Sequence, residues 1–184
     1  MKTFSISLIL LILITSLFAG KGEIGGVICL GYMGFPDAPD GIGLGLGPRV
    51  EYPIATDWLR IGGELNYFRL APGFLLEISD PAYFHDLSFL VDLGFGKGNS
   101  KWQFGLGLHN MSRTYTDSAS DEQKQKNGSW TKLGFHIGQS NRFYLSKGLT
   151  GVQDTRIIFA SLGKEEQSYY FNAQVTFGVL FSAF

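Results

Sequence analysis

The sequence predicts an all-β protein, a single eight-stranded antiparallel up-and-down transmembrane β-barrel. Three observations predict it. From Glu23 onwards, apolar residues recur with a period of two, which is the strand period. The positions between them are largely glycine with scattered charges. The chain of 184 residues holds 25 Gly and 16 Phe but only 17% charged residues, against about 25% in soluble domains.

Length, charge and cysteine content exclude several protein classes. A chain of 184 residues fits one domain. The formal net charge of −1 lacks the basic footprint of a nucleic-acid-binding protein. With Cys29 as the single cysteine, neither an intramolecular disulfide framework nor a Cys-rich zinc site is possible.

The first residues have the pattern of a secretory signal peptide. Lys2 is followed by the apolar run Ile6–Ile14 and then by small residues that end at Ala19. The run is shorter than the roughly 18–20 apolar residues that a spanning helix needs. We therefore expect residues 1–19 to be cleaved and residues 20–184 to form the barrel domain, with a retained N-terminal anchor as the alternative.

Eight segments show the alternation, four in each half of the chain. In the first half their apolar positions are Ile24, Ile28, Leu30 and Tyr32; Ile42, Leu44, Leu46, Val50 and Tyr52; Leu59, Ile61, Leu65 and Tyr67; and Leu87, Phe89, Val91, Leu93 and Phe95. In the second half they are Trp102, Phe104, Leu106 and Leu108; Leu133, Phe135, Ile137, Phe143 and Leu145; the weaker pair Ile157 and Phe159; and Phe171, Ala173, Val175, Phe177, Val179 and Phe181.

The glycine at alternate positions indicates which face of each strand points into the barrel. Water-facing strand positions normally carry Thr, Lys, Glu or Ser, because glycine weakens a strand. Glycine suits the crowded interior of a narrow closed barrel, which leaves the large apolar side chains to face lipid. Apolar-out, polar-in strands of about 10 residues are typical of transmembrane β-barrels.

The connections alternate between short and long, as in hairpins that return on two sides of a membrane. The short ones are Pro53–Thr56, Gly96–Ser100 and Lys147–Gly151, and the long ones are Phe35–Asp40, Arg69–Tyr83 and the hydrophilic Tyr115–Gly128. Aromatic residues flank the short turns, where an interfacial girdle is expected. They are Tyr52, Trp58, Phe95, Trp102 and Tyr144.

The whole of this pattern, with the terminal segment Phe177–Phe184, resembles the small OmpA/OmpX-like outer-membrane barrels of Gram-negative bacteria. The resemblance implies insertion by the barrel assembly machinery, which reads a last strand ending in Phe. Phe184 has the opposite parity from Phe177, Val179 and Phe181. Either a bulge near Leu180 corrects the phase or Phe181 is the girdle residue.

A charge network is predicted inside the barrel. The short turn Pro53–Thr56 brings Arg60 opposite or diagonal to Glu51 on the inner face. We expect Arg60 to lie between Glu51 and Asp92, and the network to continue through two further residues of the inner face, Arg49 and Glu64.

Other candidate chemistry is weak. His109 and His136 are expected to face inward at similar levels, but the pattern places no third metal ligand. A lipid A deacylase would need a Ser two residues from an outward-facing His, which His136 lacks. The segment His85–Ser88 resembles only weakly the catalytic set of His, Asp and Ser in an acyltransferase. We expect no catalytic residue, no metal and no cofactor.

The expected function is that of a non-enzymatic surface protein of the outer membrane, with a structural, adhesive or interaction role through the connections Arg69–Tyr83 and Tyr115–Gly128. The expected partners are outer-membrane lipid and lipopolysaccharide, the barrel assembly machinery and an unidentified extracellular partner, with no nucleic acid and a monomeric state. The alternatives are a lipid A-modifying enzyme and a soluble periplasmic β-barrel that binds a hydrophobic ligand.

Overall fold

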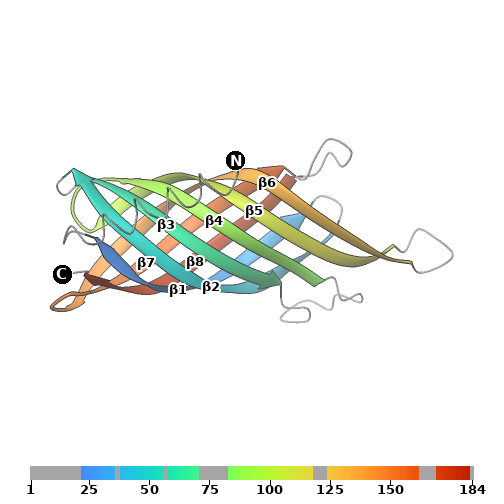
Figure 1. Ribbon diagram of the computed structural model, residues 1–184, viewed down its shortest axis with the longest axis horizontal. Helices are drawn as coiled ribbons and strands as arrows, with labels where there is room; N and C mark the ends of the chain where they lie inside the picture. The colour runs from blue at the N-terminus through green and yellow to red at the C-terminus, as the bar shows by residue number, and fades with distance from the viewer. Residues whose placement is uncertain are drawn as a thin grey trace, which may run out of the picture.

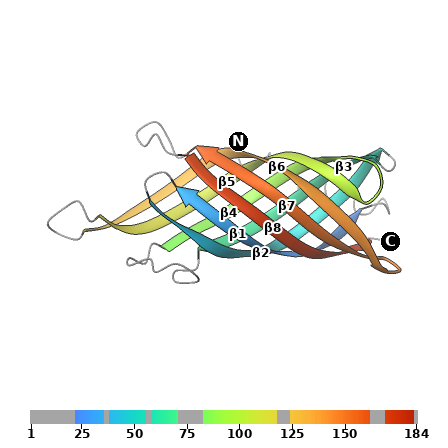
Figure 2. The same ribbon diagram turned by 180° about the vertical axis from the view of Figure 1, so that it is seen from behind.

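The computed structural model describes residues 22–35, 38–55, 58–70, 83–117, 124–161 and 169–182. These residues form eight strands in one closed antiparallel barrel (Figure 1), which confirms the predicted fold. The strands are β1 (Glu23–Phe35), β2 (Ala38–Ala55), β3 (Leu59–Leu70), β4 (Tyr83–Phe95), β5 (Ser100–Asp117), β6 (Lys124–Ser146), β7 (Leu149–Ser161) and β8 (Tyr169–Ser182). Each strand pairs with the next one along the chain, and β8 returns to pair with β1 (Figure 2).

The two faces of the wall follow the alternation in the sequence. Large apolar side chains cover the outside, as with Ile28 at 64% exposed and Leu133 at 67% exposed. The residues between them point inward, and Arg49 and His109 are almost fully buried. Because successive side chains of a strand point to opposite faces, one period of two determines both surfaces.

Glycine on the inner face leaves room for larger neighbours. A Cβ atom on Gly43 would lie 2.4 Å from the ring of Phe68, and one on Gly45 would lie 2.5 Å from the Cys29 sulfur. The lumen is therefore too narrow for a side chain at every inward position, as expected of an eight-stranded barrel.

The two ends of the barrel differ, and we call them the turn end and the hairpin end. The turn end carries the short turns. The start of β1 and the end of β8 also lie at this end, with Glu23 opposite Ser182. In its β6–β7 turn, Gly148 has a φ of 76°, a left-handed conformation that glycine adopts without strain. At the hairpin end, the β5–β6 hairpin extends beyond the remaining strands (Figure 1).

Two of the predicted long connections are shorter than the sequence predicts. The sequence predicts a loop at Phe35–Asp40, but Phe35 pairs with Ala38, so the ladder reaches the tip of the hairpin. It also predicts a loop at Tyr115–Gly128, yet pairing continues to Asp117 and Lys124. The prediction follows the hydrophilicity of this segment, whereas two hairpin arms above a membrane can pair and still face water on both sides.

The last strand keeps a regular register with β1 from Phe171 to Ser182, so it contains no bulge at Leu180. Leu180 is fully buried, while Phe181 is 56% exposed on the outer face. Phe184, residues 1–19 and most of Arg69–Tyr83 lie outside the described residues. Within the described part of the chain, no helix is long and apolar enough to cross a membrane.

Candidate functional site: the lumen and its charge network

Arg49 lies at the centre of the lumen and contacts carboxylates from three strands. Its Nε is 2.9 Å from Glu51 Oε1 on its own strand. Its Nη1 lies 3.4 Å from Glu64 Oε2 on β3 and also pairs with Asp154 on β7. Arg49, Glu64 and Asp154 are almost fully buried. A buried charge is tolerated when it is paired and hydrogen-bonded, and these contacts pair Arg49 across the barrel.

Arg156 makes the second set of cross-lumen contacts. Its guanidinium donates two hydrogen bonds to Glu64, at 2.9 Å to Oε2 and 2.5 Å to Oε1. Its Nε donates to Gln174 Oε1 on the neighbouring strand at 2.9 Å. This two-point geometry matches the planar fork of an arginine to a carboxylate. Glu64 therefore joins Arg49 and Arg156.

A second group of charges surrounds the mouth at the turn end. Arg142 pairs with both Glu23 and Glu51. Arg60 lies 2.9 Å from Glu23 and 3.7 Å from Glu51. The Thr150 hydroxyl donates to Glu23 at 3.0 Å. Arg60 is 25% exposed, so this group is more open to solvent than the central one.

The structure places the five charges predicted for the lumen on the inner face but changes one of their partners. Arg60 contacts Glu51, as expected, but its second partner is Glu23. Within the described residues, no ion pair joins Arg60 to Asp92. Asp92 pairs in register with Gly62, and its carboxylate lies over that glycine, 2.7 Å from where a Cβ would be. Because Gly62 has no side chain, the Asp92 carboxylate can occupy the space over it. Gly62 is two residues along β3 from Arg60, so Asp92 is not opposite Arg60.

Sequence reasoning missed four charged members of the network. They are Glu23, Arg142, Asp154 and Arg156. Asp154 and Arg156 share one parity on β7, and this spacing could have identified them as a pair on one face. Their pairing with β2 and β3 could not be found from the spacing, because it spans the lumen.

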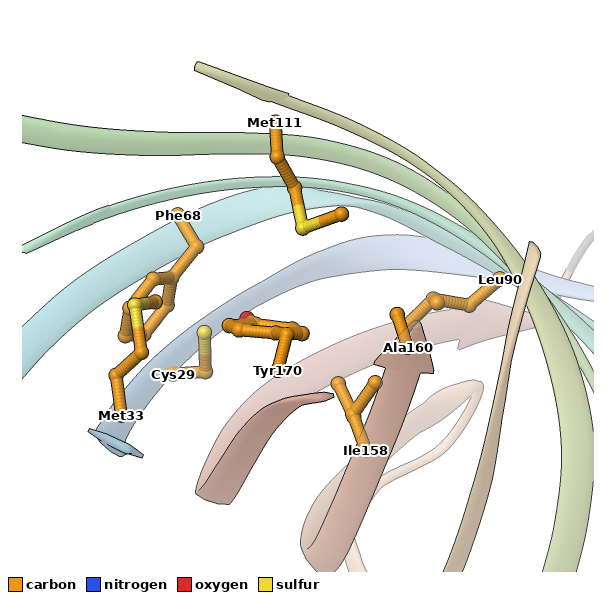
Figure 3. Packing of buried hydrophobic residues seen from close by; sticks show 8 residues of the cluster. All are labelled: Cys29, Met33, Phe68, Leu90, Met111, Ile158, Ala160 and Tyr170. Atoms are coloured by element: carbon orange, nitrogen blue, oxygen red, sulfur yellow. The ribbon is translucent and has the colours of Figure 1, made fainter. Parts of the chain in front are cut away.

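A cluster of buried apolar residues packs inside the barrel (Figure 3). Its members are Cys29, Met33, Phe68, Leu90, Met111, Ile158, Ala160 and Tyr170. Sequence reasoning expected a polar interior and missed this cluster, although the parity of Met33 and Phe68 already placed them inward. A smaller apolar cluster of Val27, Val152 and Leu180 lies nearer the turn end, so the lumen combines buried ion pairs with packed apolar side chains.

Buried polar groups adjoin the apolar cluster. His109 Nδ1 lies 2.8 Å from Asp86 Oδ2, and the Tyr170 hydroxyl donates to the same oxygen at 3.4 Å. Asn172 donates to the Tyr170 oxygen at 2.7 Å. His109 Nε2 has no hydrogen-bond partner among the described residues.

The structure places His109 and His136 inside the barrel, at different positions along the ladder. His136 pairs with Gly105, whereas His109 pairs with Lys132. Both rings are buried, and both nitrogens of His136 lack a partner among the described atoms. Within the described residues, no group of three or more His, Cys, Asp and Glu side chains could hold a metal ion.

The His85–Ser88 segment does not form the arrangement of an acyltransferase. His85 lies on the outer face and contacts Tyr67, whereas Asp86 and Ser88 are buried on the inner face. Asp86 instead contacts His109. His136 points inward as well, away from any lipid substrate.

The aromatic residues predicted for a girdle lie near the turn end. Phe95 and Trp102 form a cross-strand pair next to the β4–β5 turn. The exposed fractions are 50% for Trp58, 59% for Trp102 and 77% for Tyr144. Tyr52 pairs with Ile61 near the β2–β3 turn. The Tyr and Trp side chains among them, with an apolar ring and a polar edge, suit the level of lipid headgroups.

Solved outer-membrane proteins share this fold. Ail, the attachment invasion locus protein of Yersinia pestis, superposes with a TM-score of 0.60 at 15% identity, over 88% of this chain and 99% of Ail. A major outer membrane protein of Thermus thermophilus gives 0.58 at 14% identity, over 87% and 98%. Neisserial surface protein A gives 0.54 at 11% identity, over 88% and 96%.

No protein-family model matches the sequence, and no curated protein matches it either. At these low identities the structural likeness shows the fold alone, a small closed eight-stranded antiparallel barrel that these outer-membrane proteins share.

Proposed function

We propose that this protein is a non-enzymatic surface barrel of the outer membrane of a Gram-negative-type bacterium, with a closed lumen and an interaction surface at the hairpin end. The apolar outer wall supports the membrane location. Every strand has at least 12 residues, and a tilted strand needs about 9–11 to cross the hydrocarbon region. A soluble ligand-binding barrel would place such a surface on the inside.

The ion pairs across the lumen are the observation that carries the proposal. Glu64 on β3 binds Arg156 on β7, and Arg49 on β2 binds Asp154 on β7. These contacts connect opposite sides of the wall, so a diffusing solute would have to break them. At the mouth, the space beside Glu51 and Arg142 has a volume of about 10 Å³, which is room for about one water molecule.

The β5–β6 hairpin supports the interaction role. β6 pairs with β7 only from Gly134 onwards, so Lys124–Leu133 has no partner on that side in the described residues. An unpaired edge offers main-chain donors and acceptors to an extended segment of another protein. The name of Ail records attachment, and we infer attachment through this edge as the role of the present protein.

Fractionation and conductance test the membrane location and the closed lumen. The protein should be recovered with outer-membrane vesicles, and the purified barrel should give no steady ion current in a planar bilayer. Recovery in the soluble periplasm would reject the membrane location. A stable open-channel current would reject the closed lumen but leave the membrane location intact.

The attachment role has its own experiment. Cells that express the intact protein should adhere to a cultured cell layer, and a variant with the hairpin shortened to the Ser112–Ser129 pair should not. Insertion of the shortened barrel is checked by its gel mobility before and after boiling. Equal adherence of the two strains would reject attachment through the hairpin.

Lipid A analysis addresses the enzymatic alternative. Mass spectrometry should show the same acyl pattern for lipid A from cells with the protein and from cells without it. A changed pattern would replace the proposed non-enzymatic function with a lipid A-modifying one.

A further inference from the structure

A polar row crosses four neighbouring strands on the outer face at the hairpin end. In the ladders, Arg69 on β3 pairs with His85 on β4, His85 with Ser112 on β5, and Ser112 with Ser129 on β6. Arg69, Ser112 and Ser129 are exposed, and His85 is half-buried. We call these four residues the outer polar row.

The surface becomes apolar within two positions of this row. The next outward row toward the turn end is mixed: Tyr67, Leu87, Asn110 and Thr131. The row after it is entirely apolar: Leu65, Phe89, Leu108 and Leu133. The outer polar row therefore lies at the boundary of the apolar wall that is nearer the hairpin end, where lipid headgroups would meet acyl chains.

The two basic side chains of the row, Arg69 and His85, lie opposite each other on the neighbouring strands β3 and β4. On β7 and β8 the last outward side chains that the structure describes before the hairpin end are Phe159 and Phe171, whose ring centroids lie 5.6 Å apart. Tyr32 on β1 and Ile42 on β2 continue this apolar sector.

His85 is held in a defined orientation within the row. Its Nδ1 lies 2.5 Å from the Tyr67 hydroxyl, and the two rings lie 5.7 Å apart. When the Tyr67 hydroxyl donates to Nδ1, the proton of a neutral imidazole is on Nε2, which is then a donor. Protonation of the ring also leaves a donor at Nε2. Tyr67 thus prepares His85 to donate a hydrogen bond.

Arg69 and His85 have no carboxylate partner among the described residues. The neighbouring acid, Asp86, points into the lumen and contacts His109. A guanidinium, an imidazole N–H and two hydroxyls together present several hydrogen-bond donors, with no carboxylate among them. Arginine beside hydroxyl and imidazole donors is well suited to a phosphate group, since its planar fork binds two phosphate oxygens.

We propose that the outer polar row binds the phosphate group of a phosphorylated outer-leaflet lipid, whose acyl chains lie against the apolar rows beneath. Arg69 and His85 bind the phosphate, and Ser112 and Ser129 bind neighbouring headgroup oxygens. The apolar residues directly below favour a lipid over a free anion, because an inorganic phosphate gains nothing from them. This inference rests on the proposed surface location, since it requires the hairpin end to face the outer leaflet.

Native mass spectrometry of the purified full-length barrel in detergent tests the site. The probes are bis-phosphorylated lipid A, the same lipid A after removal of both phosphates, and inorganic phosphate. The wild-type protein should retain phosphorylated lipid A and lose most binding to the dephosphorylated form. Arg69→Gln should weaken retention about 10- to 100-fold, as expected for loss of a charged hydrogen bond, and His85→Phe should weaken it as well.

Lys97→Gln is the matched control, because Lys97 is an exposed cation in the β4–β5 turn at the opposite end of the barrel. It should leave lipid retention unchanged. Equal losses in Lys97→Gln and Arg69→Gln, or equal binding of dephosphorylated lipid A, would overturn the proposed site. Competition by inorganic phosphate as strong as that by lipid A would overturn the lipid as its source.

The outcome is separable from that of the proposed function. A barrel found in the soluble periplasm would fail the fractionation experiment whatever its lipid binding. A barrel correctly inserted in the outer membrane, with no preference for phosphorylated lipid, would reject only the outer polar row. Unchanged gel mobility of the variants before and after boiling shows that a loss of binding is not a loss of folding.

Discussion

Breaking the Glu64–Arg156 pair should destabilise the barrel by several kcal/mol. Both side chains are about 1% exposed, and their two hydrogen bonds measure 2.5 and 2.9 Å. Glu64→Leu leaves Arg156 buried with Gln174 as its remaining partner in the described residues. Removal of one member of a buried ion pair costs about 3–5 kcal/mol, because the other charge is left without compensation.

The double variant decides whether this reasoning is right. Replacement of both charges, Glu64→Leu with Arg156→Met, removes the unpaired charge as well as the pair. Replacing a buried ion pair with apolar side chains of similar volume is often close to neutral. Arg49 keeps Glu51 and Asp154 as partners. The double variant should therefore be more stable than either single variant, with a coupling free energy of about 2–4 kcal/mol.

The assay is equilibrium urea unfolding in detergent micelles or lipid vesicles, with the folded fraction read from gel mobility of unboiled samples. A matched cycle with Glu23→Ala and Arg60→Ala at the mouth is the control. Arg60 is 25% exposed, and the coupling of a solvent-accessible pair is about 1 kcal/mol or less. Losses for Glu64→Leu and Arg156→Met that are small and simply add would refute the existence of a coupled lumen network.

Three further predictions concern orientation, closure and packing. Trypsin added to intact cells should cut at Lys124, at the tip of the β5–β6 hairpin, and spare the rest of the barrel; cleavage only after permeabilisation would mean that the topology is inverted. Unboiled protein should migrate differently from boiled protein on a detergent gel, because a closed barrel leaves no unpaired edge in lipid, and identical migration would contradict closure. Gly45→Ala should destabilise the barrel by about 1–3 kcal/mol in the urea assay, since the new Cβ would lie 2.5 Å from Cys29 Sγ. Gly26→Ala, which meets no atom within 4 Å, should have little effect, and equal losses in the two variants would contradict the packing argument.

Local alternation determined the strands and their faces. The position of Leu44 and Leu46 between Gly43, Gly45 and Gly47 already predicts which side chains lie on the outer face of the barrel, because a strand has only two faces. By the same rule, Arg49 and Glu51 share the inner face, and their ion pair lies within one strand. The extent of the ladder was less certain, because hydrophilic residues such as Lys124 and Lys126 are equally compatible with a loop and with a paired hairpin above the membrane.

Closure of the barrel determines which residues meet across the lumen. Arg49 and Asp154 are 105 residues apart, and Glu51 and Arg142 are 91 apart. No periodicity or turn length brings these residues together. They meet because β8 pairs with β1, which bends the wall into a cylinder and sets β6 and β7 across the lumen from β2 and β3. A strand pattern specifies which face a side chain occupies, but its partner across a closed barrel depends on the register of every ladder around the ring.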